Sequence, residues 1–275
     1  MVMIAAGYVV VSLGASVSSA NLPADFDHAY TDYAAVLREY VRPPRVDYER
    51  LKANRSVLDR VVAGLNSDTA RGEPSWSREE RMAFWINAYN VLTLQAIVNH
   101  YPIRGGWFSR GQSPSIRQIP GVWTTLNWPV AGKTVTLDDI EHKILRPQFA
   151  DPRIHFAINC ASVGCPPLAP VPYRAEGLSE SLDAAARTYL ASPQGLVADN
   201  RTLRVTSIFD WYGDDFIAQY GPRMPGAQPA KTRAILAVVA AFGPPPAAAV
   251  ASSPDVTLRF LDYDWRLNDT SSSPR

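Results

Sequence analysis

One capped helix constrains this chain more than any other segment of the sequence. Ser77 and Glu80 match a capping box, in which each side chain accepts a hydrogen bond from the backbone N–H of the other residue. An apolar run follows, so we predict a helix over residues 77–100, and Pro102 ends it. The aromatic residues in the middle of this helix should be buried and contribute to the core.

The remaining segments mix helices with short strands. Helices are predicted over residues 25–40, 48–65, 136–147, 179–190 and 207–216, strands over residues 153–159, 203–206 and 256–263, and a hairpin across residues 131–133. Residues 243–254, rich in Gly, Pro, Ala and Ser, are predicted to be flexible. Because strands and long helices do not alternate regularly, we predict an α+β class. We expect a single domain, with its core over residues 25–268 and its helices packed on a small, mostly antiparallel sheet.

The composition excludes several classes of protein. The 275 residues are 47% hydrophobic and carry 27 Lys and Arg against 26 Asp and Glu, a net charge of +1, which is typical of a globular chain. A nucleic-acid binder would show a strong basic excess, so we expect no nucleic-acid partner. The sequence holds no phosphate-loop, dinucleotide-binding or His-Glu-x-x-His motif, so we expect no cofactor and no metal site.

The N-terminal segment predicts export. Residues 1–20 contain no charged side chain and run from an apolar stretch into small residues, the pattern of a secretory signal peptide cleaved after Ala20. The pattern lacks the usual basic residue before the apolar stretch. We therefore expect residues 21–275 to form a single periplasmic or secreted domain, with no stable membrane span once the peptide is removed. Disulfide bonds are permitted in that compartment.

Six motifs carry a family resemblance. They occupy residues 45–48, 84–90, 137–142, 153–168, 208–212 and 261–265. On these motifs the chain resembles the domain-of-unknown-function family 547 (DUF547), in its exported bacterial form, over residues 46–268. The resemblance implies no known activity, because none is established for the family. The domain is also distantly similar to papain- and transglutaminase-like folds, an analogy of fold that carries little functional weight.

The two cysteines, Cys160 and Cys165, allow opposite interpretations. Cys160 follows a predicted strand, a common position for a nucleophile, and would be the nucleophile of a thiol-dependent hydrolase or acyl transferase acting on a peptide, amide or ester. Alternatively, a turn containing Gly164 brings the two cysteines close enough for a structural disulfide. That bridge would brace a loop of a non-catalytic protein that binds a small molecule or peptide, the interpretation the sequence slightly favours. A redox-active pair is a third possibility.

A thiol nucleophile needs a base, and His142 and His155 are the candidates. His155 lies on the predicted strand over residues 153–159, where five residues span about 16 Å and its side chain points away from Cys160. His142 lies on another element, with aspartates one helical turn before it that could orient its ring. Glu141 is adjacent in sequence, points elsewhere on the helix, and is a candidate ligand-binding residue. Either histidine could instead be a hydrogen-bonded structural residue.

Asparagines complete the candidate site. Asn87 and Asn90 share one face of the helix over residues 77–100. Asn87 is a candidate catalytic residue, as a donor to a reacting carbonyl or as a group that orients a histidine. The alternative, which the sequence favours, is that these amides satisfy backbone groups near Cys160. Asn90 is a candidate ligand-binding residue, as are Asn159 and Ser162, which flank Cys160 in the sequence.

Overall fold

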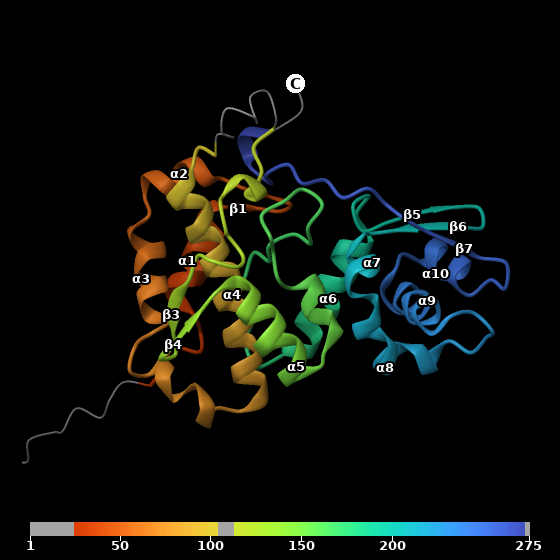
Figure 1. The fold of residues 1–275 in the computed structure, drawn as a ribbon, viewed down its shortest axis with the longest axis horizontal. Coiled ribbons are helices and arrows are strands. Elements are labelled where there is room, and N and C mark those ends of the chain that lie inside the picture. The colour runs from red at the N-terminus through yellow and green to blue at the C-terminus, as the bar shows by residue number, and fades with distance from the viewer. Residues whose placement is uncertain (1–24, 104–112, 273–275) are drawn as a thin grey trace, which may run out of the picture.

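Two hydrophobic clusters meet side by side along the long axis of the molecule (Figure 1). The computed structural model describes residues 25–103 and 113–272, so the predicted signal peptide lies outside the described residues. The first cluster is built mainly from residues 30–182 and the second mainly from residues 186–251. The three-residue-per-turn helix η5 (Pro152–Phe156) joins them, because Ile154 is buried in the first cluster and Phe156 in the second.

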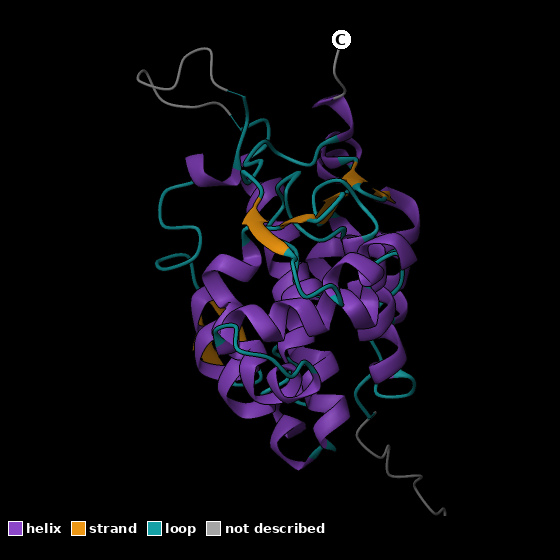
Figure 2. Cartoon of the chain, turned by 90° about the vertical axis from the view of Figure 1, so that its right-hand side faces the viewer, coloured by secondary structure: helices purple, strands orange, loops and turns teal. Residues whose placement is uncertain are grey.

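The helices make up most of the molecule, and the strands are short (Figure 2). The helices other than η5 are α1 (Thr31–Tyr40), α2 (Tyr48–Ala53), α3 (Ser56–Gly64), η1 (Ala70–Ser75), α4 (Arg78–His100), η3 (Ile116–Gln118), η4 (Asp139–Leu145), α5 (Arg146–Phe149), α6 (Leu178–Leu190), α7 (Ile208–Tyr212), η6 (Gly213–Phe216), α8 (Ile217–Tyr220), η7 (Gly221–Arg223), α9 (Ala230–Phe242), α10 (Pro245–Ala251) and η8 (Thr270–Ser272). Within residues 25–103 and 113–272, no helix has both the length and the apolar character needed to cross a bilayer.

Helix α4 is the centre of the first cluster, and the capping box predicted at its start is present. The Ser77 hydroxyl accepts from the Glu80 backbone N–H at 3.2 Å, and the Glu80 carboxylate accepts from the Ser77 N–H at 2.8 Å. From Met82 to Leu94 every side chain of the helix is buried. A helix buried on all sides needs other elements around it, which explains why η4, α2 and α3 pack against α4.

Within residues 25–103 and 113–272 the strands form three small sheets. This confirms the predicted α+β class, although we expected a single sheet. Two are antiparallel pairs, β1 (Val41–Arg42) with β2 (Arg45–Val46) and β3 (Trp128–Val130) with β4 (Lys133–Val135). The third has the order β5 (Leu196–Asp199), β6 (Thr202–Val205), β7 (Thr257–Phe260), with β7 parallel to β6. The predicted hairpin is confirmed between β3 and β4, where Ala131 and Gly132 both adopt positive φ.

Two segments differ from the sequence predictions. The predicted strand over residues 153–159 is wrong, because this segment forms η5, which Asp151 caps by accepting from the Arg153 N–H at 3.0 Å. Both faces of the segment are buried between the clusters, so its alternating pattern did not mark a half-buried strand. Within residues 243–254, expected to be flexible, Pro245–Ala251 forms helix α10, which packs against α9.

Three predicted helices have different bounds. The helix predicted over residues 48–65 is broken into α2 and α3 near Asn54, whose side chain donates to the Arg50 carbonyl. The helix predicted over residues 25–40 begins only at Thr31, after a turn in which the Asp27 carboxylate accepts two backbone N–H groups. Pro147 does not end the helix after residue 136, because it occupies the first turn of α5, where proline is tolerated.

Candidate active site

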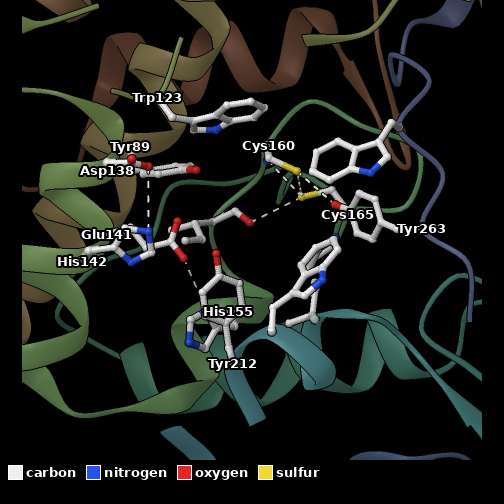
Figure 3. Close-up of a pocket in the computed structure, with 15 residues that line it drawn as sticks. Tyr89, Trp123, Asp138, Glu141, His142, His155, Cys160, Cys165, Tyr212 and Tyr263 are labelled. Carbon is white, nitrogen blue, oxygen red and sulfur yellow. Dashed lines mark hydrogen bonds and ion pairs between the residues drawn. The ribbon is translucent and has the colours of Figure 1, made fainter. Parts of the chain in front are cut away.

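A pocket of about 300 Å³ opens where the two clusters meet. It collects thiol, carboxyl, imidazole and aromatic side chains from α4, η4, η5, α7 and three loops (Figure 3). The lining includes Tyr89, Trp123, Asp138, Glu141, His142, His155, Cys160, Cys165, Trp211, Tyr212, Tyr263 and Trp265. The structure therefore brings together both cysteines, both candidate histidines and Glu141 around one pocket.

Two asparagines fix the cysteine loop, residues 157–166, from behind. Asn90 of α4 donates to the Ala157 carbonyl at 3.0 Å and accepts from the Asn159 N–H at 2.8 Å. Asn159 in turn donates to the Pro166 carbonyl at 2.7 Å and accepts from the Ala161 N–H at 2.9 Å. Both amides are buried and satisfy backbone groups, so they shape the loop and do not line the pocket.

The chain near its C-terminus crosses over the cysteine loop and holds it from the other side. The Val163 N–H donates to the Arg266 carbonyl at 2.8 Å, and the Gly164 N–H donates to the Asp264 carbonyl at 2.9 Å. A Cβ atom on Gly164 would lie only 2.8 Å from the Asp264 backbone nitrogen, so only glycine permits this approach. We call residues 261–268 the C-terminal strap; it carries Tyr263 over the cysteines.

Cys160 lies in a cluster of hydrogen-bonding groups. Its sulfur is 3.1 Å from the Tyr263 hydroxyl, 3.1 Å from the Ser162 hydroxyl and 3.0 Å from the Cys165 sulfur. The contact with the Cys165 thiol, followed by the contacts with Ser162 and Tyr263, outweighs the effect of burial and lowers the pKa of Cys160 to about 7. A substantial fraction of this sulfur is therefore a thiolate at neutral pH.

Cys165 is the buried member of the pair. Its sulfur accepts from the Cys160 backbone N–H at 2.9 Å and lies 3.8 Å from the Ile158 carbonyl. Burial and the neighbouring Cys160 sulfur raise the pKa of Cys165 well above its usual value. No disulfide joins the two cysteines in this structure. Because the pKa of Cys160 is lowered and that of Cys165 is raised, Cys160 is the one that ionises first.

His155 is completely enclosed and is oriented by Asp215 of η6. Its Nε2 lies 2.8 Å from the Asp215 carboxylate, its ring stacks on Tyr212 with centroids 4.3 Å apart, and burial lowers its pKa. Arg146 binds the same carboxylate through two hydrogen bonds of 2.7 and 2.8 Å. Burial alone would raise the pKa of Asp215, but the bonds from His155 and Arg146 hold it well below its usual range. Because an ionised carboxylate only accepts, Nε2 carries the proton and Nδ1 remains free as an acceptor.

Glu141 connects His155 to the pocket. Its carboxyl group lies 3.8 Å from His155 Nδ1 and projects into the pocket, on the side facing the two sulfurs (Figure 3). The pKa of Glu141 is raised to about 7, chiefly by burial and also by the nearby Cys160, while Tyr212 and Arg146 oppose the shift. A carboxyl group with this pKa is partly protonated at neutral pH and is able to donate a proton.

His142 lies at the rim and is already paired. Its Nδ1 accepts from the Arg146 guanidinium at 3.0 Å, and its Nε2 lies 3.8 Å from Asp138, one turn earlier as the sequence suggested. Burial lowers its pKa. Because arginine can only donate, Nδ1 is not available as a base in this arrangement. All four histidines are described, and neither His142 nor any other is within hydrogen-bond distance of the Cys160 sulfur.

Asn87 does not reach the pocket. Its amide donates to the Tyr173 carbonyl at 2.7 Å and accepts from the Tyr173 N–H at 3.0 Å, so both of its polar atoms bind backbone. This buried amide therefore satisfies backbone groups, but those of Tyr173 and not those near Cys160. The structure offers no geometry for Asn87 as a donor to a reacting group.

Aromatic rings form the mouth of the pocket. Trp211 lies 4.8 Å from Tyr263 and 5.8 Å from Trp265 between ring centroids, and Trp123 lies 6.2 Å from Trp265. Trp211 is 45% exposed, an unusual state for so large an apolar side chain, and its neighbouring rings are half-buried. This aromatic wall, defined as Trp123, Trp211, Tyr263 and Trp265, gives an apolar or aromatic group of a ligand a surface on which to pack.

Several residues that line the pocket or lie behind it were not identified from the sequence. Asp215 and Arg146 carry no motif, although Tyr212 and Tyr263 lie in two of the six family motifs, which had no role assigned to them. The signal available in the sequence was the presence of Tyr212 and Tyr263 in family motifs far from the cysteines. The contacts of Asp215 with His155 and of Tyr263 with Cys160 join residues 60 and 103 positions apart, so no local pattern predicts them.

Fold and pocket together define the class: an α+β protein with a cysteine pair, a histidine and carboxyl groups around one pocket. In the described parts of the chain, no three His, Cys, Asp or Glu side chains are grouped so as to hold a metal ion. Residues 74–190 match the family described as "Protein of unknown function, DUF547". This match confirms the resemblance predicted from the sequence, over a range shorter than residues 46–268. No curated protein and no solved structure matches the chain.

Proposed function

We propose that this protein is a thiol-dependent hydrolase or acyl transferase with Cys160 as its nucleophile. One observation carries the proposal: the Cys160 sulfur lines a pocket, touches two hydroxyl groups and a second thiol, and faces a protonatable carboxyl group backed by a buried histidine. Such a sulfur is nucleophilic at neutral pH without an adjacent imidazolium.

The reaction begins when the Cys160 thiolate attacks an ester, thioester or amide carbonyl and forms a sulfur–carbon bond. The tetrahedral intermediate then collapses, the bond to the leaving group breaks, and Glu141 gives that group its proton. Water, or another acceptor in the transferase case, attacks the resulting thioester after losing a proton to Glu141, and Cys160 leaves as thiolate. Glu141 thus acts first as acid and then as base.

His155 acts through Glu141 and not on the sulfur. Asp215 fixes the proton on His155 Nε2, so that Nδ1 faces the Glu141 carboxyl group at 3.8 Å. A hydrogen bond from protonated Glu141 to this nitrogen would orient the carboxyl group toward the pocket. We therefore assign His155 as a positioning residue, in place of its role as a base suggested by the sequence.

Labelling by an electrophile tests the nucleophile. Reduced protein is treated under native conditions with limiting iodoacetamide, and the modified cysteine is identified by mass spectrometry. We expect Cys160 to be labelled in the wild type and in His142→Ala, since His142 is paired at the rim. Thioester hydrolysis, measured with a small panel of acyl thioesters, should be lost in Cys160→Ser. In Cys165→Ser it should require a higher pH, because the Cys165 thiol is the main contact that lowers the pKa of Cys160. Exclusive labelling of Cys165, or hydrolysis by Cys160→Ser, would contradict the proposal.

A second candidate function rests on the 3.0 Å separation of the two sulfurs. In an oxidising compartment this pair would close to a disulfide that braces the cysteine loop of an exported protein binding a small molecule or peptide. The free-thiol count of protein purified without reductant separates the two functions. Absence of free thiols, with a lower melting temperature in Cys160→Ser, would favour the binding protein. Two free thiols would favour the enzyme.

We propose separately that the protein is exported, a proposal supported by the sequence of residues 1–20 alone. The N-terminal residue of protein recovered from the periplasm or medium tests it. We expect the mature chain to begin at Asn21. Retention of Met1 in a cytoplasmic fraction would contradict export.

A further inference from the structure

We infer that the cysteine pair also reduces organic hydroperoxides, with Cys160 as the attacking thiol and Cys165 as the thiol that resolves it. This activity goes beyond the proposed acyl chemistry and does not depend on it. It uses the same sulfur, but it also needs Cys165, which takes no part in hydrolysis.

The two cysteines differ in a way that suits these roles. Both cysteines line the pocket, but Cys160 is partly exposed, whereas Cys165 is buried and only 6% exposed. A substrate therefore reaches the Cys160 sulfur first. Cys165 is placed to react only with what forms on that sulfur, at a distance of 3.0 Å.

Two hydroxyl groups are positioned to assist the reduction. Tyr263 and Ser162 each lie 3.1 Å from the Cys160 sulfur, and they lie 3.0 Å from each other. When the sulfur attacks one peroxide oxygen, the other oxygen develops negative charge close to these groups. Hydrogen bonds to that oxygen stabilise the transition state, because they are directed at charge that appears only as the O–O bond breaks.

The chemistry balances over two steps. In the first, the Cys160 thiolate attacks the terminal oxygen of ROOH, the O–O bond breaks, and the departing RO⁻ takes a proton to become an alcohol, leaving a sulfenic acid. In the second, the Cys165 sulfur loses its proton and attacks the Cys160 sulfur, and the hydroxyl group leaves with that proton as water. Two thiols are oxidised to a disulfide by one hydroperoxide, and a dithiol reductant restores them.

The loop can accept this bond with little movement. A disulfide needs its sulfurs about 2.05 Å apart, so the two must approach by about 1 Å. The hydrogen bonds of Asn159 to Ala161 and Pro166 involve backbone atoms on the two sides of the pair and do not depend on the thiols. Side-chain rotation of the cysteines is therefore sufficient, and the asparagine scaffold is retained.

The aromatic wall selects the class of hydroperoxide. Trp211 and Trp265 present an apolar surface beside the sulfur, which favours an alkyl or aryl hydroperoxide over hydrogen peroxide. Cumene hydroperoxide, which carries one aromatic ring, is therefore the probe of choice.

The test follows a single turnover of the fully reduced protein. Cumene hydroperoxide is mixed with wild-type protein, and thiol loss and intact mass are measured over time. We expect loss of two thiols and two hydrogen atoms per peroxide, about tenfold or more faster than in the same chain unfolded in guanidinium, which retains the thiols but not the site. Hydrogen peroxide should react more slowly. A rate equal to that of the unfolded chain would overturn the inference, and equal rates for both peroxides would overturn the substrate class.

Variants separate this activity from the acyl chemistry. Cys165→Ser, confirmed as folded by circular dichroism, should stop at a sulfenic acid that dimedone traps on Cys160; Cys165→Ala serves if the serine variant does not fold. Glu141→Gln should hydrolyse thioesters about a hundredfold more slowly but still form the disulfide. A disulfide-linked dimer in place of the intramolecular bond, or no sulfenic acid in either Cys165 variant, would contradict the assigned roles.

Discussion

At the scale of single residues, Cys160 and Glu141 lose their protons in the same pH range, because the pKa of the thiol is lowered and that of the carboxyl group is raised. Hydrogen bonds, chiefly from Cys165, lower the pKa of Cys160 to about 7, and burial raises that of Glu141 to about 7. Thioester hydrolysis needs a thiolate and a protonated carboxyl group. We therefore expect kcat/KM to rise with pH as Cys160 ionises and to fall as Glu141 ionises, with a maximum near pH 7.

Glu141→Gln is the matched variant for this pH profile. Glutamine keeps the shape of the side chain but does not titrate, so the falling limb should disappear while the rising limb of Cys160 remains. The maximal kcat/KM should drop by about a hundredfold, the usual contribution of a positioned acid. Steady-state kinetics over pH 5–9 measure both effects. A falling limb that persists in Glu141→Gln would assign it to another group.

The same buried carboxyl group should cost stability when it ionises. Its folded-state pKa of about 7 lies above the usual 4.5, so its favourable contribution is complete below pH 4.5 and is lost as the pH rises through 7. The difference corresponds to about 3 kcal/mol. Denaturant titrations at pH 5 and pH 8 should therefore find Glu141→Gln more stable than wild type by about 2–3 kcal/mol at pH 8 and by little at pH 5. An equal difference at both pH values would show that ionisation of Glu141 is not responsible.

At the scale of elements, the contact between the cysteine loop and the C-terminal strap controls the thiol. Gly164 permits that contact, because a Cβ atom there would lie 2.8 Å from the Asp264 backbone nitrogen. Gly164→Ala should displace the strap and take the Tyr263 hydroxyl away from the Cys160 sulfur. We expect the pKa of Cys160 to rise, seen as a shift of iodoacetamide labelling to higher pH, with a loss of about 1–3 kcal/mol in stability.

A control comes from another glycine. At Gly64, the last residue of α3, a Cβ atom would meet no other atom within 4 Å, so Gly64→Ala should leave the labelling profile unchanged. If Gly164→Ala titrated like the wild type, the strap would not set the reactivity of the thiol.

The sequence predicted elements best where their determinants are local. The capping box of Ser77 and Glu80 lies within four residues, and it forms as predicted. The segment containing His155 was assigned wrongly because burial on both faces imitates strand alternation, and this error also placed His155 too far from the thiols. The cysteines, Glu141 and both histidines could be found as candidates from their type and position. Asp215 could not, since its role comes from a contact with a residue 60 positions away.

At the scale of the whole molecule, the site depends on the junction of the two clusters. Asp215 belongs to η6, packed in the second cluster through Phe216, and it binds Arg146 and His155 from elements that reach the first. The carboxylate therefore joins both clusters behind the pocket. A change at Asp215 should affect stability and chemistry together.

Asp215→Asn tests this junction. Because the folded-state pKa of Asp215 is low, the ionised carboxylate contributes its full stabilisation at pH values above the usual pKa of 3.8. That stabilisation is lost as the pH falls toward the folded-state pKa. The variant should be less stable than wild type by about 1–3 kcal/mol at pH 7, and the difference should narrow as the pH is lowered below about 4.

Asparagine no longer fixes the proton on His155 Nε2, so kcat for thioester hydrolysis should fall while native labelling of Cys160 persists. Denaturant unfolding and kinetics on the same samples measure both, with Asp183→Asn, an exposed partner of Arg153, as the control. If Asp215→Asn reduced stability without changing kcat, the histidine would serve only the fold.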